Sequence, residues 1–229
     1  MERGLYIAAS GMLAEQVRQN QIANDLANSS TPGYKADRST QKGFGEMLLE
    51  NSTTGQTVGP IGLGVVVDKT VTDFSAAPIR DTGEPLDFAI EGDGFFEVRT
   101  AQGNRYTRNG QFMRSAQGQL TDSLGNPVLS RNGGTVQVQA DGTVAPNAIG
   151  VFKLNNPQKA GDSLFTGTAA DAATGTVRSG ALESSGADPT RAMVDMITSY
   201  RAYEAGQKVI KTIDETLNKA VTQVPNLTG

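Results

Sequence analysis

The chain contains 229 residues with a net charge of −4, 37% hydrophobic residues, and neither cysteine nor histidine. Without cysteine there is no disulfide or thiolate metal site, and without histidine there is no imidazole ligand and no serine–histidine triad. No basic cluster could follow a phosphate backbone and no apolar run approaches the roughly 20 residues that cross a bilayer, so we expect neither nucleic-acid binding nor membrane insertion.

Residues 3–28 are predicted to form an amphipathic helix. Leu5, Met12, Gln19 and Leu26 repeat every seven residues, a spacing typical of a helix that packs against a partner helix. A helix lying on a globular core would show the same pattern, so this stripe alone does not decide between the two. The helix is predicted to end within residues 28–33, which contain a proline and a glycine.

The region between this helix and the C-terminal one is predicted to be extended and then β-structured. Residues 36–83 show no sustained period, which predicts a linking segment with strand character only at 65–67 and 69–74. Residues 84–183 alternate short apolar runs with turn residues, which predicts a small sandwich or an open barrel. Strands are expected at 86–90, 95–99, 105–108, 112–114, 119–121, 128–129, 135–139, 150–154 and 175–178. Parts of 155–175, rich in Ala, Gly and Thr, are expected to be loop.

A second helix is predicted from Asp188, a good N-cap followed by proline, to about Gln223. Its residues alternate in spacings of 3 and 4, the a/d pattern of a coiled coil. The predicted seam positions are Met193, Met196, Tyr200, Tyr203, Gln207, Ile210, Asp214, Leu217 and Val221. Neither helix can bury its own stripe, so we expect the helices to pair with each other and with copies, and to be largely disordered in the free monomer.

No catalytic constellation emerges from the remaining polar residues. The acidic residues of the middle region, such as Asp87 and Asp93, are better explained as turn and surface residues than as a glycosidase pair. The segment EGDG at 91–94 lacks the alternating order of a calcium loop. We therefore expect no enzymatic activity, no metal and no cofactor.

Four segments resemble the signatures of bacterial flagellar basal-body rod proteins, which are related to hook proteins. They are NQIANDLANSSTPGYK at 20–35, PLDFAIEGDGFF at 85–96, YTRNGQF at 106–112, and SGALESS at 179–185 followed by YRAYE at 200–204. The positions that match the N-terminal motif are Asn24, Leu26, Ala27, Asn28, Thr31, Pro32, Gly33 and Tyr34. The segments occur in the order of the family and extend over most of the chain.

This resemblance implies an α+β fold in which a discontinuous N- and C-terminal helical coiled-coil domain is joined through an extended segment to a central all-β domain. The expected ranges are 1–35 for the first helix, 36–83 for the link, 84–183 for the β domain and 184–229 for the second helix. The expected assembly interface comprises Leu5, Met12, Gln19, Leu26, Met193, Met196, Tyr200, Tyr203, Gln207, Ile210 and Leu217.

The resemblance also implies a structural subunit of the periplasm-spanning flagellar rod, which assembles helically and transmits torque. Its expected partners are copies of itself, other rod proteins and, in transit, the flagellar type III export apparatus, with no cleaved signal peptide. The proximal rod type is favoured, and the distal type is the alternative. A protein of a different class, a non-flagellar coiled-coil binding module, would share the helices but would stop at a fixed stoichiometry.

Overall fold

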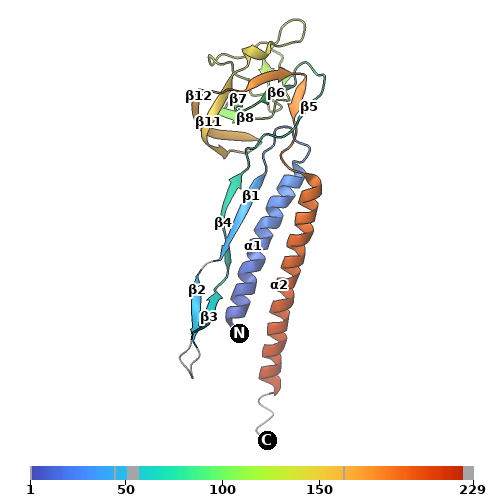
Figure 1. The fold of residues 1–229 in the computed structure, drawn as a ribbon. Coiled ribbons are helices and arrows are strands. Elements are labelled where there is room, and N and C mark those ends of the chain that lie inside the picture. The colour runs from blue at the N-terminus through green and yellow to red at the C-terminus, as the bar shows by residue number, and fades with distance from the viewer. Residues whose placement is uncertain (1, 44, 51–56, 162, 224–229) are drawn as a thin grey trace. The chain divides into compact units, whose positions relative to one another are not determined.

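The computed structural model has one long α-helix at each end of the chain and a mainly β region between them, which confirms the α+β class (Figure 1). It describes residues 2–43, 45–50, 57–161 and 163–223. The predicted domain ranges include residues 1, 44, 51–56, 162 and 224–229, and those parts of the prediction lie outside the described residues.

The chain divides into two compact units. The first, the helix unit, contains residues 1–26, 37–71 and 189–229, and the second, the β unit, contains residues 27–36 and 72–188. These units differ from the expected ranges at one informative place. Residues 27–36, which follow the first helix and carry the TPGYK motif, belong with the β unit rather than with the helices.

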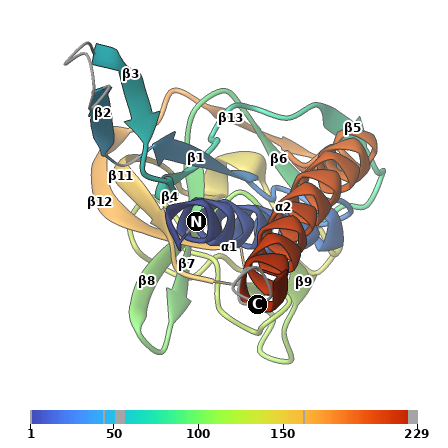
Figure 2. The same cartoon turned by 90° about the horizontal axis from the view of Figure 1, so that it is seen from below.

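The helix unit contains α1 (Glu2–Ala27) and α2 (Pro189–Gln223), whose bounds agree with the two predicted helices. The helices run side by side (Figure 2). Two antiparallel ribbons complete the unit. One pairs β1 (Asp37–Gly43) with β4 (Val65–Thr72), and the other pairs β2 (Glu46–Glu50) with β3 (Thr57–Gly62). The Val65 N–H donates to the Ser10 hydroxyl at 3.3 Å, so the first ribbon is attached to α1.

The β unit is built around a closed four-stranded barrel in the order β11-β12-β8-β7. Its strands are β7 (Phe95–Thr100), β8 (Gly103–Thr107), β11 (Val151–Lys159) and β12 (Leu164–Ala172). Three two-stranded sheets surround it: β13 (Thr176–Ser179) with β6 (Phe88–Glu91), β14 (Ala181–Glu183) with β5 (Ile79–Asp81), and β10 (Leu120–Thr121) with β9 (Met113–Arg114). A short 3-10 helix, η1, spans Pro146–Ala148.

Two hydrophobic clusters form the core of the β unit. The larger includes the fully buried Phe88, Phe96 and Leu120. The smaller surrounds Phe165, whose ring centroid lies 5.4 Å from that of Phe74. Together they bury most of the large apolar side chains of this unit, as expected for its main source of stability.

Four predictions about the β region were wrong. Residues 155–159 and 164–172 form strand in β11 and β12 rather than loop, because barrel closure supplies the partners that these weak strand formers need. Residues 37–43, 46–50 and 57–62 are not merely a link, since they form β1, β2 and β3. Residues 135–139 make only isolated bridges, such as the bridge between Leu129 and Thr135. The barrel is closed rather than open.

Candidate assembly surface and buried ion cluster

The two helices contact each other in antiparallel orientation through small residues. A Cβ atom added to Gly206 of α2 would lie 2.7 Å from Met12 Cγ of α1, and one added to Gly4 would lie 3.2 Å from Ile213 Cδ1. Glycine therefore allows the helices to approach each other closely.

A polar contact lies within the same interface. The Ser199 hydroxyl, which is fully buried, donates to Glu15 Oε2 at 2.6 Å. One α2 turn before it, Asp195 Oδ1 lies 4.0 Å from Arg18 Nη2 in an exposed ion pair. A hydrogen bond between side chains of two helices forms only when the two residues lie opposite each other. The Glu15–Ser199 bond therefore fixes the register of α1 relative to α2.

The less exposed side of α2 differs from the predicted seam at five of its nine positions. Met196, Tyr203, Ile210 and Leu217 lie on it as predicted. The intervening positions are Ala192, Ser199, Gly206 and Ile213, each one residue before a predicted seam position. Met193 and Tyr200 are instead 53% and 56% exposed, and Gln207, Asp214 and Val221 are also exposed. Small residues face α1 because they permit close packing, which a search for large apolar residues overlooks.

On α1 the predicted positions Leu5, Met12, Gln19 and Leu26 are all half-buried. The Nε2 atom of Gln19 is buried and has no hydrogen-bond partner among the described residues. A buried donor without a partner weakens the contact between α1 and α2 at this position.

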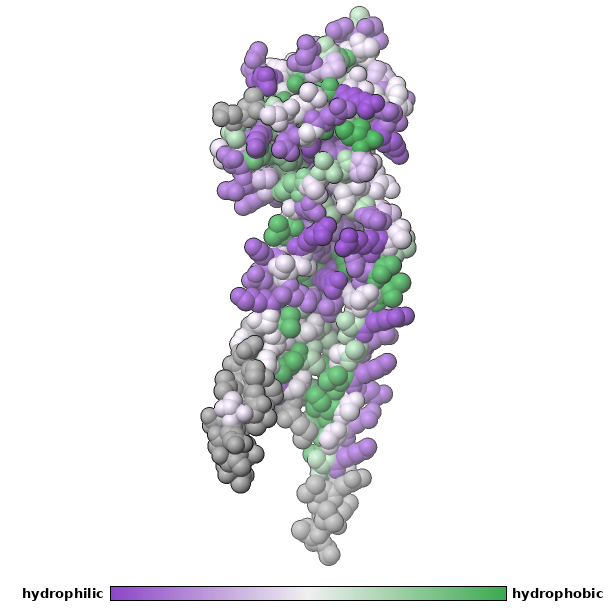
Figure 3. Space-filling view, in the orientation of Figure 1, coloured by the Kyte–Doolittle hydropathy of each residue, from purple (hydrophilic) through white to green (hydrophobic). Residues whose placement is uncertain are grey.

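Each helix also exposes a second apolar stripe. Tyr6, Leu13 and Val17 of α1 are 61%, 64% and 46% exposed and, at 100° per residue, lie opposite the side that contacts α2. On α2, Met193, Ile197 and Tyr200 are spaced by 4 and 3 residues and are all more than half exposed. Apolar side chains accordingly reach the surface along the helices between hydrophilic ones (Figure 3). Exposed apolar side chains aligned along one face of a helix are a candidate interaction surface.

The β unit contains a buried cluster of three charged side chains. Lys35 Nζ lies 2.6 Å from Glu183 Oε1, and Arg108 Nε lies 3.3 Å from Glu183 Oε2 without hydrogen-bond geometry. All three side chains are at most 4% exposed. Lys35 also donates to the Ser75 carbonyl, and the Ala77 N–H donates to Glu183 Oε1. These bonds compensate part of the cost of removing the charges from water.

Arg108 completes the cluster from the barrel side. Its guanidinium donates to the carbonyls of Ile90 at 3.2 Å and Gly92 at 2.6 Å. Burial lowers the pKa of Arg108, and the negative charges of Glu183 and Asp93 partly oppose this effect. The four segments that carried the family resemblance therefore meet here, since they supply Lys35, the two carbonyls, Arg108 and Glu183.

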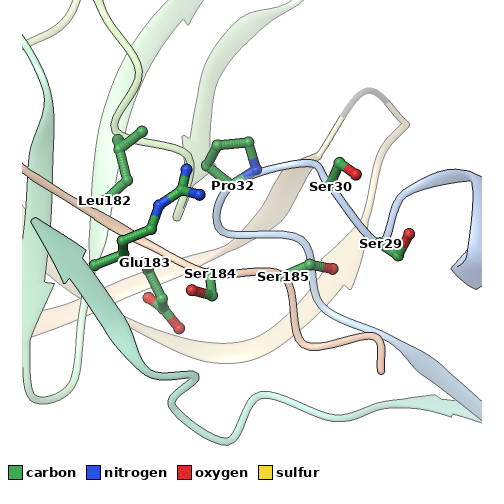
Figure 4. A pocket seen from close by; sticks show the side chains of 8 residues that line it. Ser29, Ser30, Pro32, Leu182, Glu183, Ser184 and Ser185 are labelled. Carbon is green, nitrogen blue, oxygen red and sulfur yellow. The ribbon is translucent and has the colours of Figure 1, made fainter. Parts of the chain in front are cut away.

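A cavity of about 320 Å³ lies beside the cluster, between the segment after α1 and the segment after β14 (Figure 4). It is lined by Ser29, Ser30, Pro32, Arg80, Leu182, Glu183, Ser184 and Ser185. Sequence reasoning missed both the cluster and this cavity, because Lys35 and Glu183 are 148 residues apart and no local pattern links them.

The described part of the chain has no helix that is long and apolar enough to cross a membrane. Within the same residues, no group of three or more acidic side chains is arranged to hold a metal ion.

Comparisons with known proteins give one consistent family. Residues 5–35 match the family described as flagella basal body rod protein, residues 89–151 match the flagellar hook protein FlgE/F/G D1 domain, and residues 178–223 match the flagellar basal body rod FlgEFG protein C-terminal family.

Similar whole proteins carry related names. The flagellar basal-body rod protein FlgG of Bacillus subtilis is 33% identical over 96% of this chain and 98% of its own length. The flagellar basal-body rod protein FlgF of Caulobacter vibrioides is 29% identical over 98% of each chain. The flagellar hook-basal body complex protein FlhO of Bacillus subtilis is 29% identical over 98% of this chain and 99% of its own length.

Proposed function

The chain belongs to the flagellar basal-body rod and hook protein family, and on this premise we propose that it assembles helically through its terminal helices into the rod that transmits torque. The family is structural, so the chain is a structural subunit of the flagellar basal body. We further propose that the chain reaches the rod through the flagellar type III export apparatus.

The exposed apolar stripes of α1 and α2 are the observation that carries this proposal. Met193, Ile197 and Tyr200 remain more than half exposed although α2 already contacts α1. Complete burial of an exposed apolar side chain contributes about 1.5–3 kcal/mol, so burying the remaining exposed half of each of these side chains contributes roughly 1 kcal/mol. When the stripe of one copy contacts a different surface of the next, the contacts do not close on themselves, and an open helical assembly results.

Both helices have nearly balanced charges, which supports close packing of many copies. The α1 segment has two basic and three acidic residues, and the α2 segment has five basic and four acidic residues. Surfaces with little net charge do not repel copies of themselves at short range.

The experiment is complementation of motility in the bacterium from which the native gene has been deleted. Ile197→Asp places a charge on the exposed stripe of α2, whereas Ile210→Asp and Leu26→Asp place one at half-buried predicted seam positions. We expect all three variants to be exported but to form no rod and to give no motility. The matched control is Leu124→Asp, which changes a 60% exposed leucine of the β unit. Normal motility with Ile197→Asp, Ile210→Asp and Leu26→Asp would refute assembly through the helices.

Within the rod we favour the proximal position, with the distal position as the alternative. Relatives named FlgG, the distal type, and FlgF are similar to this chain at 33% and 29% identity, so identity alone does not distinguish the types. Gold labelling of a tagged subunit along isolated rods tests the assignment. Label at the end nearer the export apparatus supports the proximal position, and label at the hook end supports the distal one.

A further inference from the structure

Residues 31–35, which we call the strap, join two parts of the β unit that are far apart in sequence. The Gly33 N–H donates to the Glu183 carbonyl at 2.9 Å, and the Gly186 N–H donates to the Tyr34 carbonyl at 2.8 Å. Lys35 adds the buried ion pair with Glu183. The strap is therefore held by the segment that leads from β14 toward α2.

The strap also lies directly against the barrel side of the cluster. Gly33 has a φ of +65°, and a Cβ atom added to it would lie 2.3 Å from the backbone carbonyl carbon of Arg108. Only glycine combines this conformation with this approach.

The strap is largely buried in the β unit, with Tyr34 and Lys35 7% and 1% exposed, and a cationic group takes part in holding each of these side chains. Lys35 is in the ion cluster, and the Tyr34 ring lies 4.5 Å from Lys159 Nζ in a cation–π contact. Among the described residues, neither hydrophobic cluster of the β unit includes a residue of the strap. A segment held in this way can open locally without unfolding the core beneath it.

When the strap is docked, the chain just after α1 lies beside the chain just before α2. The Ser185 hydroxyl donates to the Asn28 carbonyl at 2.9 Å, one residue beyond the end of α1. With the strap released and the core folded, the Asp73–Ala36 and Ser184–Pro78 backbone bonds still shorten the connection, so the path between the helices runs through residues 28–36, 73–78 and 184–188, about 20 residues. The Ser185–Asn28 bond reduces this path to residues 28 and 185–188, about five residues, and so raises the local concentration of one helix near the other by roughly 8-fold, since loop closure scales as the three-halves power of length.

We propose that the strap is a latch that controls the pairing of α1 and α2 within one chain. Docking of the strap on Glu183 favours the paired helices, and its release lets them separate while the β core stays folded. This concerns the single chain and goes beyond the proposed assembly, so it can be tested on dilute monomer.

The test uses two introduced cysteines in the full chain, which has none of its own. Met12→Cys and Gly206→Cys face each other across the helix pair, and their effective concentration is measured from disulfide formation in glutathione buffer. Glu183→Gln is introduced in this background, with Arg178→Gln as the matched control. Arg178 forms exposed ion pairs with Asp81 at 2.6 Å and with Glu91 at 3.4 Å, both partners lying outside the strap.

We expect Glu183→Gln to lower the effective concentration of the two thiols several-fold, and by roughly 8-fold if the strap is fully released. Trypsin should then cleave after Lys35, which is 1% exposed when the strap is docked. In hydrogen exchange, the Gly33 and Gly186 amides should lose protection together, while the Leu120 amide, bonded to the Val136 carbonyl in the core, keeps it.

Two results would overturn the latch. One is an effective concentration in Glu183→Gln that matches the Arg178→Gln control. The other is loss of protection at the Leu120 amide together with the strap amides, which would mean that strap and core unfold as one unit. Ser185→Ala serves as a second variant if Glu183→Gln fails to fold, because it leaves the ion cluster intact and removes only the hydroxyl that donates to the Asn28 carbonyl and accepts from the Ala187 N–H. It should lower the effective concentration by a smaller factor, and an unchanged value in that variant would also refute the proposal.

Discussion

Two glycines within the helices allow the contact between α1 and α2 to be measured. Gly206 faces Met12, whereas a Cβ atom added to Gly11 would meet no atom within 4 Å. Both lie in helix interiors, where alanine is more favourable than glycine by about 1 kcal/mol. Changing each to alanine therefore adds the same helical preference, and only Gly206→Ala adds a steric conflict.

The expected changes in the free energy of unfolding follow from the helical preference and the steric conflict. We expect Gly11→Ala to stabilise the helix unit by about 1 kcal/mol. In Gly206→Ala the new methyl group must displace Met12, and overpacking typically costs about 1–3 kcal/mol. The net effect of Gly206→Ala is thus between no change and a destabilisation of about 2 kcal/mol.

The assay is urea unfolding of dilute protein, followed by circular dichroism at 222 nm. The difference in the free energy of unfolding between the two variants gives the packing cost, because the helical preference cancels. Equal stabilisation by both substitutions would show that α1 and α2 are not in contact at Gly206 in the free chain.

Three further predictions concern the β unit. Phe165→Ala should lower the free energy of unfolding by about 3–5 kcal/mol in urea titrations, because it empties the centre of the smaller cluster. Gly110→Ala should prevent folding of the unit, as judged by loss of near-ultraviolet dichroism, because the new Cβ atom would overlap the Phe88 carbonyl oxygen. Gly134→Ala is the control and should fold, because its new Cβ atom would lie 3.6 Å from Ser130 Oγ, an ordinary contact distance. Burial, and secondarily Glu97, raises the pKa of Tyr106. The unfolded chain therefore loses this proton first, so the stability that the neutral phenol contributes below about pH 10 declines as the pH rises through the folded-state pKa. Tyr106→Phe should reduce that decline in unfolding experiments between pH 9 and 11, and an unchanged decline would contradict the assigned cause.

The ends of the helices were predictable because local chemistry determines them. Pro189 begins α2, and Pro32 with Gly33 follows α1, as expected for residues that start or stop helices. The register of the helix contact was only half predictable. Ser199 and Gly206 face α1 because they are small and allow close approach, and their polarity or lack of a side chain hides them from hydrophobic periodicity.

The barrel and the ion cluster could not be predicted from local patterns, because their contacts join residues that are far apart in the sequence. The sequence of β12 is rich in Ala, Gly and Thr and has only a weak strand pattern. In the closed barrel, β12 nevertheless pairs with β8 and β11. Lys35 lies in a motif that local reasoning assigned to the helical domain, but its ion pair with Glu183 ties that motif to the β unit. Contacts between residues so far apart depend on the tertiary fold, which no local pattern encodes.

Thiol labelling offers the most direct test of assembly through the helices. A single cysteine replaces Tyr200, which is 56% exposed, in a chain that has no other cysteine. In the dilute monomer this thiol should react readily with maleimide. In isolated basal bodies that contain the variant, it should be protected, because the α2 stripe contacts a neighbouring subunit. Equal labelling in the monomer and in the basal bodies would contradict assembly through this surface.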